Sequence, residues 1–100
     1  MLRKILIANR GEIAVRIIRA CKEMGITSVA IYTDADRYAL HVKKADESYF
    51  IGNDPLSGYL NAHRIVNLAV TARCDGIHPG YGFLSENPQL AEICKRRGIK

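Results

Sequence analysis

The sequence predicts an α/β fold: a Rossmann-like, doubly wound parallel sheet with helices on both faces. First, short β-rich apolar runs alternate four times with segments whose apolar residues recur at helical spacing. Second, strands that alternate with helices form βαβ units, and such units build parallel sheets covered on both sides. Third, 100 residues with 48% hydrophobic and 25% charged side chains are typical of one globular domain. We therefore expect a single domain over residues 1–100.

The first half of the chain is expected to hold two strands and two helices. Lys4–Ala8 is a short apolar run typical of a strand, and Glu12–Met24 carries apolar residues at helical spacing. Gly25 follows that helix and is expected to end it as a C-terminal cap. Ser28–Tyr32 predicts the second strand, and Ala39–Ala45 predicts a short second helix.

The second half repeats the alternation. Ser48–Ile51 predicts a brief third strand near an edge of the sheet. Asn61–Arg73 predicts a helix whose first residue is the N-cap. Gly76–His78 predicts a very short fourth strand. The last helix is expected over Pro88–Arg97, because proline suits the first turn of a helix.

An internal repeat links the two halves. Cys21–Thr27 leads from a helix into the second strand, and Cys94–Lys100 has the same order of Cys-Lys, two residues and Gly-Ile. The repeat predicts that a fifth strand begins near Ile99 and that the domain belongs to a longer chain.

The composition excludes several classes of protein. The three cysteines, an odd number with no Cys-x-x-Cys spacing, predict neither disulfides nor, with the three scattered histidines, a metal site. The net charge of +5 is spread along the chain, which argues against nucleic-acid binding. No apolar run is long enough to span a membrane, and the start of the chain does not resemble a signal peptide. We expect a cytoplasmic protein.

The candidate functional segments follow the strands, because parallel sheets bind ligands at the carboxyl ends of their strands. They are Asn9–Gly11, Thr33–Arg37, Gly52–Tyr59 and Pro79–Asn87.

The first of these segments partly matches a dinucleotide-binding turn. Gly11 and Ala14 match two positions of the G-x-G-x-x-G/A pattern, and Asp34 lies where a ribose-binding carboxylate is expected. Two residues argue against it: Asn9 replaces the first glycine, and Glu12 puts a negative charge where a pyrophosphate would bind. The alternative is a structural turn at Asn9 and Gly11, in which glycine permits a tight backbone.

The first helix has a charged face. Arg16, Arg19 and Glu23 lie on one side of it at i, i+3 and i+7. This pattern is typical of a solvated surface, or of a twofold dimer contact in which arginines of one copy meet carboxylates of the other.

The segment His78–Asn87 is the most distinctive stretch. Tyr81 lies between Gly80 and Gly82, so the backbone there can be approached closely, and Phe83 and Glu86 follow. From these residues alone the segment is either a ligand-binding wall or a domain-packing loop.

These two segments carry a family resemblance. Ile7–Ala14 and His78–Asn87 together resemble the opening of biotin carboxylases, which occur as separate subunits or at the front of pyruvate, acetyl-CoA and propionyl-CoA carboxylases. Asp34–Arg37, Ala45–Glu47 and Ser57–Asn61 match the family in kind and order. The resemblance covers nearly the whole chain.

The resemblance implies a pre-ATP-grasp domain, which precedes an ATP-grasp domain and a C-terminal domain. It also implies an enzyme, an ATP-dependent ligase that uses ATP, magnesium and bicarbonate to carboxylate biotin on a carrier protein. A carboxyltransferase then passes the carboxyl group to an acceptor. Tyr81, Gly82, Phe83 and Glu86 would form the wall beside the biotin and bicarbonate pocket. Arg16, Arg19 and Glu23 would lie in the interface of a homodimer.

The family's ATP-binding, metal-binding and catalytic residues lie beyond residue 100. We therefore expect no catalytic residue in this chain, no tightly bound cofactor and no activity from residues 1–100 alone. The start of the sequence favours a pyruvate carboxylase parent over other acceptors. Two other functions stay open at this point: a small nicotinamide-dinucleotide-binding domain, and a non-catalytic interaction module that uses the charged helix face.

Overall fold

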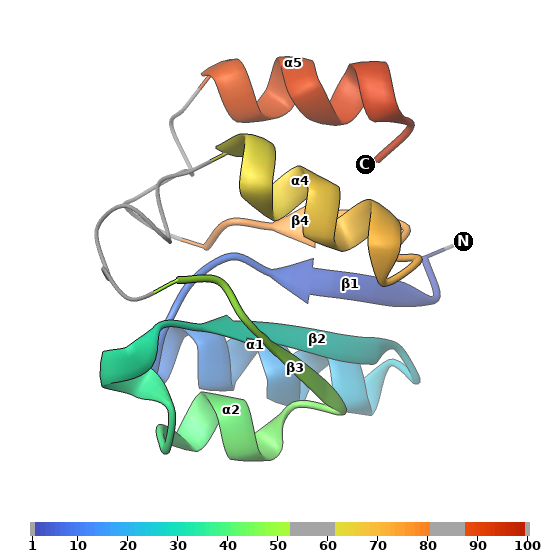
Figure 1. Cartoon of the computed structure of the whole chain (residues 1–100). Helices are drawn as coiled ribbons and strands as arrows, with labels where there is room; N and C mark the ends of the chain where they lie inside the picture. Colours follow the sequence, from blue (N-terminus) through green and yellow to red (C-terminus); the bar gives the residue numbers. More distant parts are fainter. Residues whose placement is uncertain (1, 53–61, 81–87, 100) are drawn as a thin grey trace.

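The computed structural model describes residues 2–52, 62–80 and 88–99, and within them it shows the predicted alternation of strands and helices (Figure 1). The elements in chain order are β1 (Lys4–Ile7), α1 (Gly11–Glu23), β2 (Thr27–Tyr32), the 3₁₀ turn η1 (Asp34–Asp36), α2 (Leu40–Lys44), β3 (Glu47–Phe50), α4 (Ala62–Thr71), β4 (Gly76–His78) and α5 (Pro88–Arg97).

The four described strands form one parallel sheet in the order β3-β2-β1-β4. The chain moves from β1 to β2 and β3 on one side, and β4 adds to the other side of β1. In Figure 1, α1 and α2 cover one face of the sheet, and α4 and α5 lie on the other. Right-handed crossovers that run in opposite directions from a central strand place their helices on opposite faces. The predicted doubly wound fold is confirmed.

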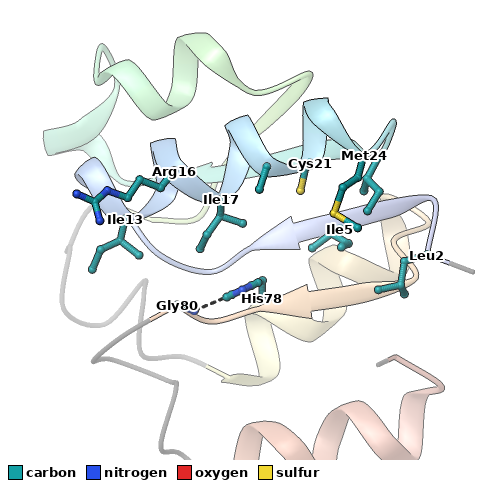
Figure 2. Close-up of a pocket in the computed structure, with 11 residues that line it drawn as sticks. Leu2, Ile5, Ile13, Arg16, Ile17, Cys21, Met24, His78 and Gly80 are labelled. Atoms are coloured by element: carbon teal, nitrogen blue, oxygen red, sulfur yellow. Dashed lines mark hydrogen bonds between the residues drawn. The ribbon is translucent and has the colours of Figure 1, made fainter.

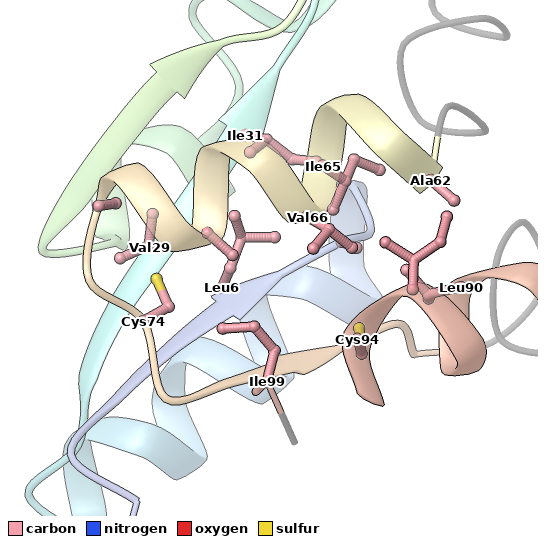
Figure 3. Packing of buried hydrophobic residues seen from close by; sticks show 14 of the residues in the cluster. Leu6, Val29, Ile31, Ala62, Ile65, Val66, Cys74, Leu90, Cys94 and Ile99 are labelled. Atoms are coloured by element: carbon pink, nitrogen blue, oxygen red, sulfur yellow. The ribbon is translucent and has the colours of Figure 1, made fainter. Parts of the chain in front are cut away.

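Each face of the sheet has its own apolar core, because successive side chains of a strand point to opposite faces. Leu6 belongs to the core under α4 and α5, whereas Ile7 packs against Ala14 and Ile18 of α1. Figure 3 shows the larger core, where side chains of the sheet meet α4 and α5. Its labelled members are Leu6, Val29, Ile31, Ala62, Ile65, Val66, Cys74, Leu90, Cys94 and Ile99.

The two helices that carry the Cys-Lys-x-x-Gly-Ile pattern end in the same way, and the predicted cap at Gly25 is confirmed. Gly25 has φ +72° and the Ile26 N–H donates to the Cys21 carbonyl at 2.8 Å. Gly98 has φ +74° and the Ile99 N–H donates to the Cys94 carbonyl at 2.9 Å. Both are Schellman caps, in which a left-handed residue lets the chain turn back over the last helical turn.

A third helix, α4, ends with the same hydrogen bonds but without glycine. The Cys74 N–H donates to the Ala69 carbonyl at 2.8 Å, and Arg73 occupies the left-handed position with φ +63°. A side chain with a Cβ is strained in this conformation. The sequence offered no glycine there, so this cap could not be predicted.

The four strands and four helices expected before Ile99 are present within the described residues, with bounds shifted by one or two residues. The fifth strand expected from Ile99 onward stays a prediction, because the described residues end there. The third strand is Glu47–Phe50 rather than Ser48–Ile51, and it lies at the predicted edge. The turn η1 was not predicted, because three residues give no periodicity. Asn61, the expected N-cap of α4, and the residues 53–59 lie outside the described residues. No described helix is long and apolar enough to cross a membrane.

Candidate functional site

The turn after β1 is built on a buried asparagine and a left-handed glycine. Asn9 is almost completely buried, and Arg10 takes an extended conformation just before α1. Gly11 has φ +65°, and a Cβ placed there would meet no atom within 4 Å. Gly11 is therefore needed for its backbone conformation and not for space, as the predicted structural turn requires.

The Asn9 side chain joins this turn to the segment after β4. Its Nδ2 donates to the Pro79 carbonyl at 2.8 Å, and its Oδ1 accepts from the Arg10 N–H at 2.8 Å. The chain runs outward from β1 in one direction and β4 lies on the opposite side, so this is the point where the strand order reverses. Open α/β sheets bind ligands in the crevice at such a point. Asn9 therefore connects the segments after β1 and β4 at the edge of the sheet where a ligand is expected to bind.

Gly80 packs directly on that asparagine. A Cβ at Gly80 would lie 2.7 Å from Asn9 Nδ2 and 3.0 Å from Ile13 Cγ2, and the residue has φ +69°. Its N–H donates to Nδ1 of His78 at 3.1 Å, the dashed line in Figure 2. Both the space and the backbone conformation require glycine here, which fixes the course of the chain as it leaves β4.

A second contact joins the turn after β1 to the segment after β2. Arg10 forms an ion pair with Asp36 of η1, whose side chain is only 5% exposed. Next to it, Arg37 binds Asp34 at 3.0 Å and lies over the rings of Tyr32 and Phe50. The contact with Asp34 raises the pKa of Arg37. The polar side chains at this edge are thus mainly engaged with one another.

An apolar groove of about 520 Å³ runs beside α1, from the start of β1 to the end of β4. Figure 2 shows Ile13 and Ile17 of α1 and Met24, the residue after it, on one side of the groove, and Ile5, Leu2 and His78 on the other. Arg16, Ala20, Cys21, Ile26 and Gly80 complete its lining. Among its described lining residues, only Arg16 and His78 have polar side chains, so the groove suits apolar contacts rather than a charged ligand.

A buried histidine lies under the end of β2. His41 of α2 is 1% exposed, and its Nε2 lies 3.2 Å from the Ile31 carbonyl. Its Nδ1 and the hydroxyl of Thr33 have no hydrogen-bond partner among the described residues. Burial lowers the pKa of His41, because an imidazolium loses its hydration there. His41 is therefore a neutral structural residue near pH 7.

The cysteines are free, buried and poor nucleophiles. Burial raises the pKa of Cys21 and Cys94, and it raises the pKa of Cys74 to about 11. A thiol of such high pKa holds its proton near pH 7, whereas a nucleophile or metal ligand needs the thiolate. Within residues 2–52, 62–80 and 88–99, no three or more His, Cys, Asp and Glu side chains are grouped to hold a metal ion.

The residues predicted to form functional sites divide into two sets. Arg16, Arg19 and Glu23 are exposed on α1, and Arg16 also binds Glu12 at 3.0 Å within the helix. Tyr81, Gly82, Phe83 and Glu86, the predicted pocket wall, lie outside the described residues.

Sequence reasoning missed the contact of Asn9 with Pro79, the ion pair of Arg10 with Asp36, and the burial of His41. The one available signal was Asn9 itself, which stands where a dinucleotide-binding turn has glycine. A buried side-chain amide needs hydrogen-bond partners, so this residue indicates a contact with another segment.

The chain matches the family described as biotin carboxylase, N-terminal domain, over residues 1–100. It belongs to this family. It is 59% identical to the 2-oxoglutarate carboxylase small subunit of Hydrogenobacter thermophilus, over 99% of the chain and 21% of that protein. It is 55% identical to a pyruvate carboxylase subunit of Methanothermobacter thermautotrophicus, over 100% of the chain and 21% of that protein. The chain thus spans about a fifth of the length of these relatives.

Solved structures agree with the family assignment. The biotin carboxylase subunit of a pyruvate carboxylase superposes with a TM-score of 0.96 at 62% identity, over 99% of the chain and 22% of that protein. The complete multifunctional pyruvate carboxylase of Rhizobium etli gives 0.93 at 45% identity, over 98% and 10%. The biotin carboxylase domain dimer of the Hydrogenobacter enzyme, with MgADP, ADP and bicarbonate, gives 0.96 at 58% identity, over 99% and 22%. Of the three functions left open by the sequence, the family of carboxylases is the one these relatives share.

Proposed function

We propose that this biotin carboxylase N-terminal domain serves in a larger ATP-dependent ligase that carboxylates carrier-bound biotin. The observation that carries the proposal is the family match over all 100 residues, together with 62% identity and a TM-score of 0.96 to the biotin carboxylase component of a pyruvate carboxylase. ATP and magnesium would activate bicarbonate, and the residues that bind them would lie beyond residue 100 in the larger protein. The domain itself contributes a rigid sheet edge and two surfaces.

The first surface is the ligand edge of β1 and β4. The predicted wall of the biotin and bicarbonate pocket, Tyr81, Gly82, Phe83 and Glu86, directly follows Gly80 in the sequence. The backbone up to Gly80 is held by Asn9 and His78. A pocket wall needs such support, because a ligand site works only when its groups are held in the productive geometry.

The second surface is the exposed face of α1. The solved Hydrogenobacter domain is a dimer, which supports a homodimer here. In a twofold contact, Arg16 and Arg19 of one copy would meet carboxylates of the other, with Glu23 on the same face. Arg16 already binds Glu12 in its own helix, so it would share or exchange that partner.

The remaining partners follow from the same proposal. They are the ATP-grasp and C-terminal domains, a biotin carrier and a carboxyltransferase, in the cytoplasm. A pyruvate carboxylase parent agrees with the relatives from Methanothermobacter and Staphylococcus, both 55% identical. The 2-oxoglutarate relative is 59% identical and a methylcrotonoyl-CoA relative 55%, so identity in this domain does not select the acceptor.

The proposal is tested by comparing the full-length gene product with residues 1–100. We expect ATP hydrolysis that requires bicarbonate and rises with added biotin from the full-length protein, and none from residues 1–100. A full-length protein without that activity contradicts the proposed function. Activity from residues 1–100 contradicts the assignment of the catalytic residues to the rest of the protein.

The dimer surface has a separate test in the same protein. Arg19→Glu should shift the sedimentation of the full-length protein from dimer toward monomer. The control Lys95→Glu makes the same charge change on α5, at another exposed position, and should leave the dimer intact. Equal sedimentation of Arg19→Glu and the wild type contradicts the role of this face.

A further inference from the structure

The strands β1 and β4 are tied together by side chains at both ends. At the amino end, the Asp75 carboxylate accepts from the Arg3 and Lys4 N–H groups at 2.8 and 2.9 Å. At the carboxyl end, Asn9 Nδ2 donates to the Pro79 carbonyl at 2.8 Å. The two ties join the same pair of strands, but only the second lies at the edge where ligands bind in such sheets.

We propose that Asn9 is a positioning residue for the biotin-binding step. It fixes the direction in which the chain leaves β4, and so sets the place from which the predicted pocket wall starts. The inference rests on the proposed function, and it assigns to Asn9 a role that acts through Pro79 and Gly80 rather than through contact with a substrate.

The geometry of Asn9 suits this role. The side chain is 2% exposed, so its amide is held by protein partners and not by bulk water. One end of the amide is fixed by the Arg10 N–H, which leaves Nδ2 aimed at Pro79. A buried amide with both ends engaged has a single orientation, because rotation would leave a donor and an acceptor unpaired.

Gly80 carries the constraint to the next residue. It can approach Asn9 only because it lacks a Cβ, which would lie 2.7 Å from Nδ2, and its φ of +69° is the conformation that glycine favours. The Gly80 N–H is held by His78 Nδ1 at the same time. The backbone from His78 to Gly80 therefore has contacts on both sides, and a displacement of Asn9 would move Pro79 and Gly80 with it.

The test uses the full-length protein that contains this domain, and free biotin as the probe of the carrier-bound group. Asn9→Asp is the sharpest variant, because it keeps the oxygen that accepts from Arg10 and turns the donor toward Pro79 into a carboxylate oxygen. We expect KM for biotin to rise about tenfold or more, since a displacement of about 1 Å at a site can cost up to 100-fold. KM for ATP should stay within about twofold.

Asp75→Asn is the matched control, because it weakens the tie at the opposite end of the same two strands. It should lower the melting temperature and leave KM for biotin unchanged. If Asn9 contributed only to stability, Asn9→Asp would likewise lower the melting temperature without changing KM for biotin. Gly80→Ala provides a second variant that approaches the contact from the other side. Its effect on KM for biotin should be smaller in an Asn9→Ala background, where the atom nearest the new methyl group is gone.

The outcomes separate the two proposals. Suppose the wild type shows biotin-dependent ATP hydrolysis. If KM for biotin is then unchanged in Asn9→Asp, or if Asn9→Asp and Asp75→Asn change it equally, this inference is overturned and the proposed function stands. A wild-type protein without biotin-dependent ATP hydrolysis overturns the proposed function and the inference together.

Discussion

The strands β1 and β4 are joined by side-chain hydrogen bonds at both ends, but the side chains differ in charge and burial. The tie at the amino end is a charged carboxylate near solvent, whereas the tie at the carboxyl end is a neutral amide buried against Gly80. A charged side chain loses little hydration free energy where water still reaches it, whereas a buried polar side chain is less costly when it is neutral and fully hydrogen-bonded. The amino end thus contributes stability that depends on pH and salt. The carboxyl end contributes a fixed geometry at the ligand edge.

The largest expected effect is at the carboxyl end. Gly80→Ala forces a methyl group to within 2.7 Å of Asn9 Nδ2 and puts a Cβ on a residue with φ +69°. The left-handed conformation alone costs roughly 1–2 kcal/mol, and the overlap adds to it. We expect the free energy of unfolding, measured in urea, to fall by about 2–3 kcal/mol. Gly11→Ala is the control, because it shares the positive φ but has open space, and it should cost less.

Acid should separate the contribution of the amino-end tie at Asp75 from that of His41, which is buried under β2. Burial lowers the pKa of His41, so the unfolded chain takes up a proton first, and stability should fall as the pH drops below the ordinary value of 6.5. The Arg3 and Lys4 N–H groups lower the pKa of Asp75, so its contribution is present above 3.8 and is lost as the pH falls through the folded-state pKa. Urea unfolding of the chain between pH 7.5 and 3 should show two separate declines.

Two variants assign these declines. His41→Gln should remove the decline below pH 6.5, and Asp75→Asn should reduce the one at lower pH. His63→Gln changes an exposed histidine and serves as the control. A wild-type stability that stays constant from pH 7.5 to 5 would show that His41 does not hold α2 against β2 as a neutral group.

The smallest expected effect concerns the turn that leads into the amino end of β4. Arg73 occupies a left-handed position where two equivalent helix ends have glycine. Arg73→Gly should therefore raise the free energy of unfolding by up to about 1 kcal/mol, since the strain of the Cβ exceeds the added flexibility of the unfolded chain. Gly25→Ala, the reverse change at α1, should lower it. A loss of stability in Arg73→Gly would mean that the arginine side chain contributes more than its backbone strain costs.

Much of the fold could be predicted because its signals are local. The periodicity of Glu12–Met24 and the glycine that follows it specify a helix and its end, and the predicted cap at Gly25 is confirmed. The edge position of the third strand followed from its brevity. Arg73 escaped prediction because its left-handed conformation is imposed by the packing of α4 and not by its own side chain.

The candidate site was only partly predictable because its contacts join distant segments. Asn9 and Pro79 are 70 positions apart, and Arg10 and Asp36 are 26 apart. Local patterns cannot reveal such pairs. The sequence did mark both segments as candidates, since each follows a strand. It could not show that a side chain of one holds the backbone of the other.

The central claim is that ligands bind at the carboxyl end of β1 and β4, where Asn9 holds Gly80. Hydrogen exchange of the full-length protein, with and without saturating biotin and bicarbonate, tests it most directly. We expect slower exchange in peptides that cover residues 8–11 and 78–80, where the Ala8 and Gly80 N–H groups are held. Peptides that cover residues 3–5 and 74–76, at the amino end, should exchange at the same rate in both conditions. Slowing at the amino end, or at neither end, would contradict the claim.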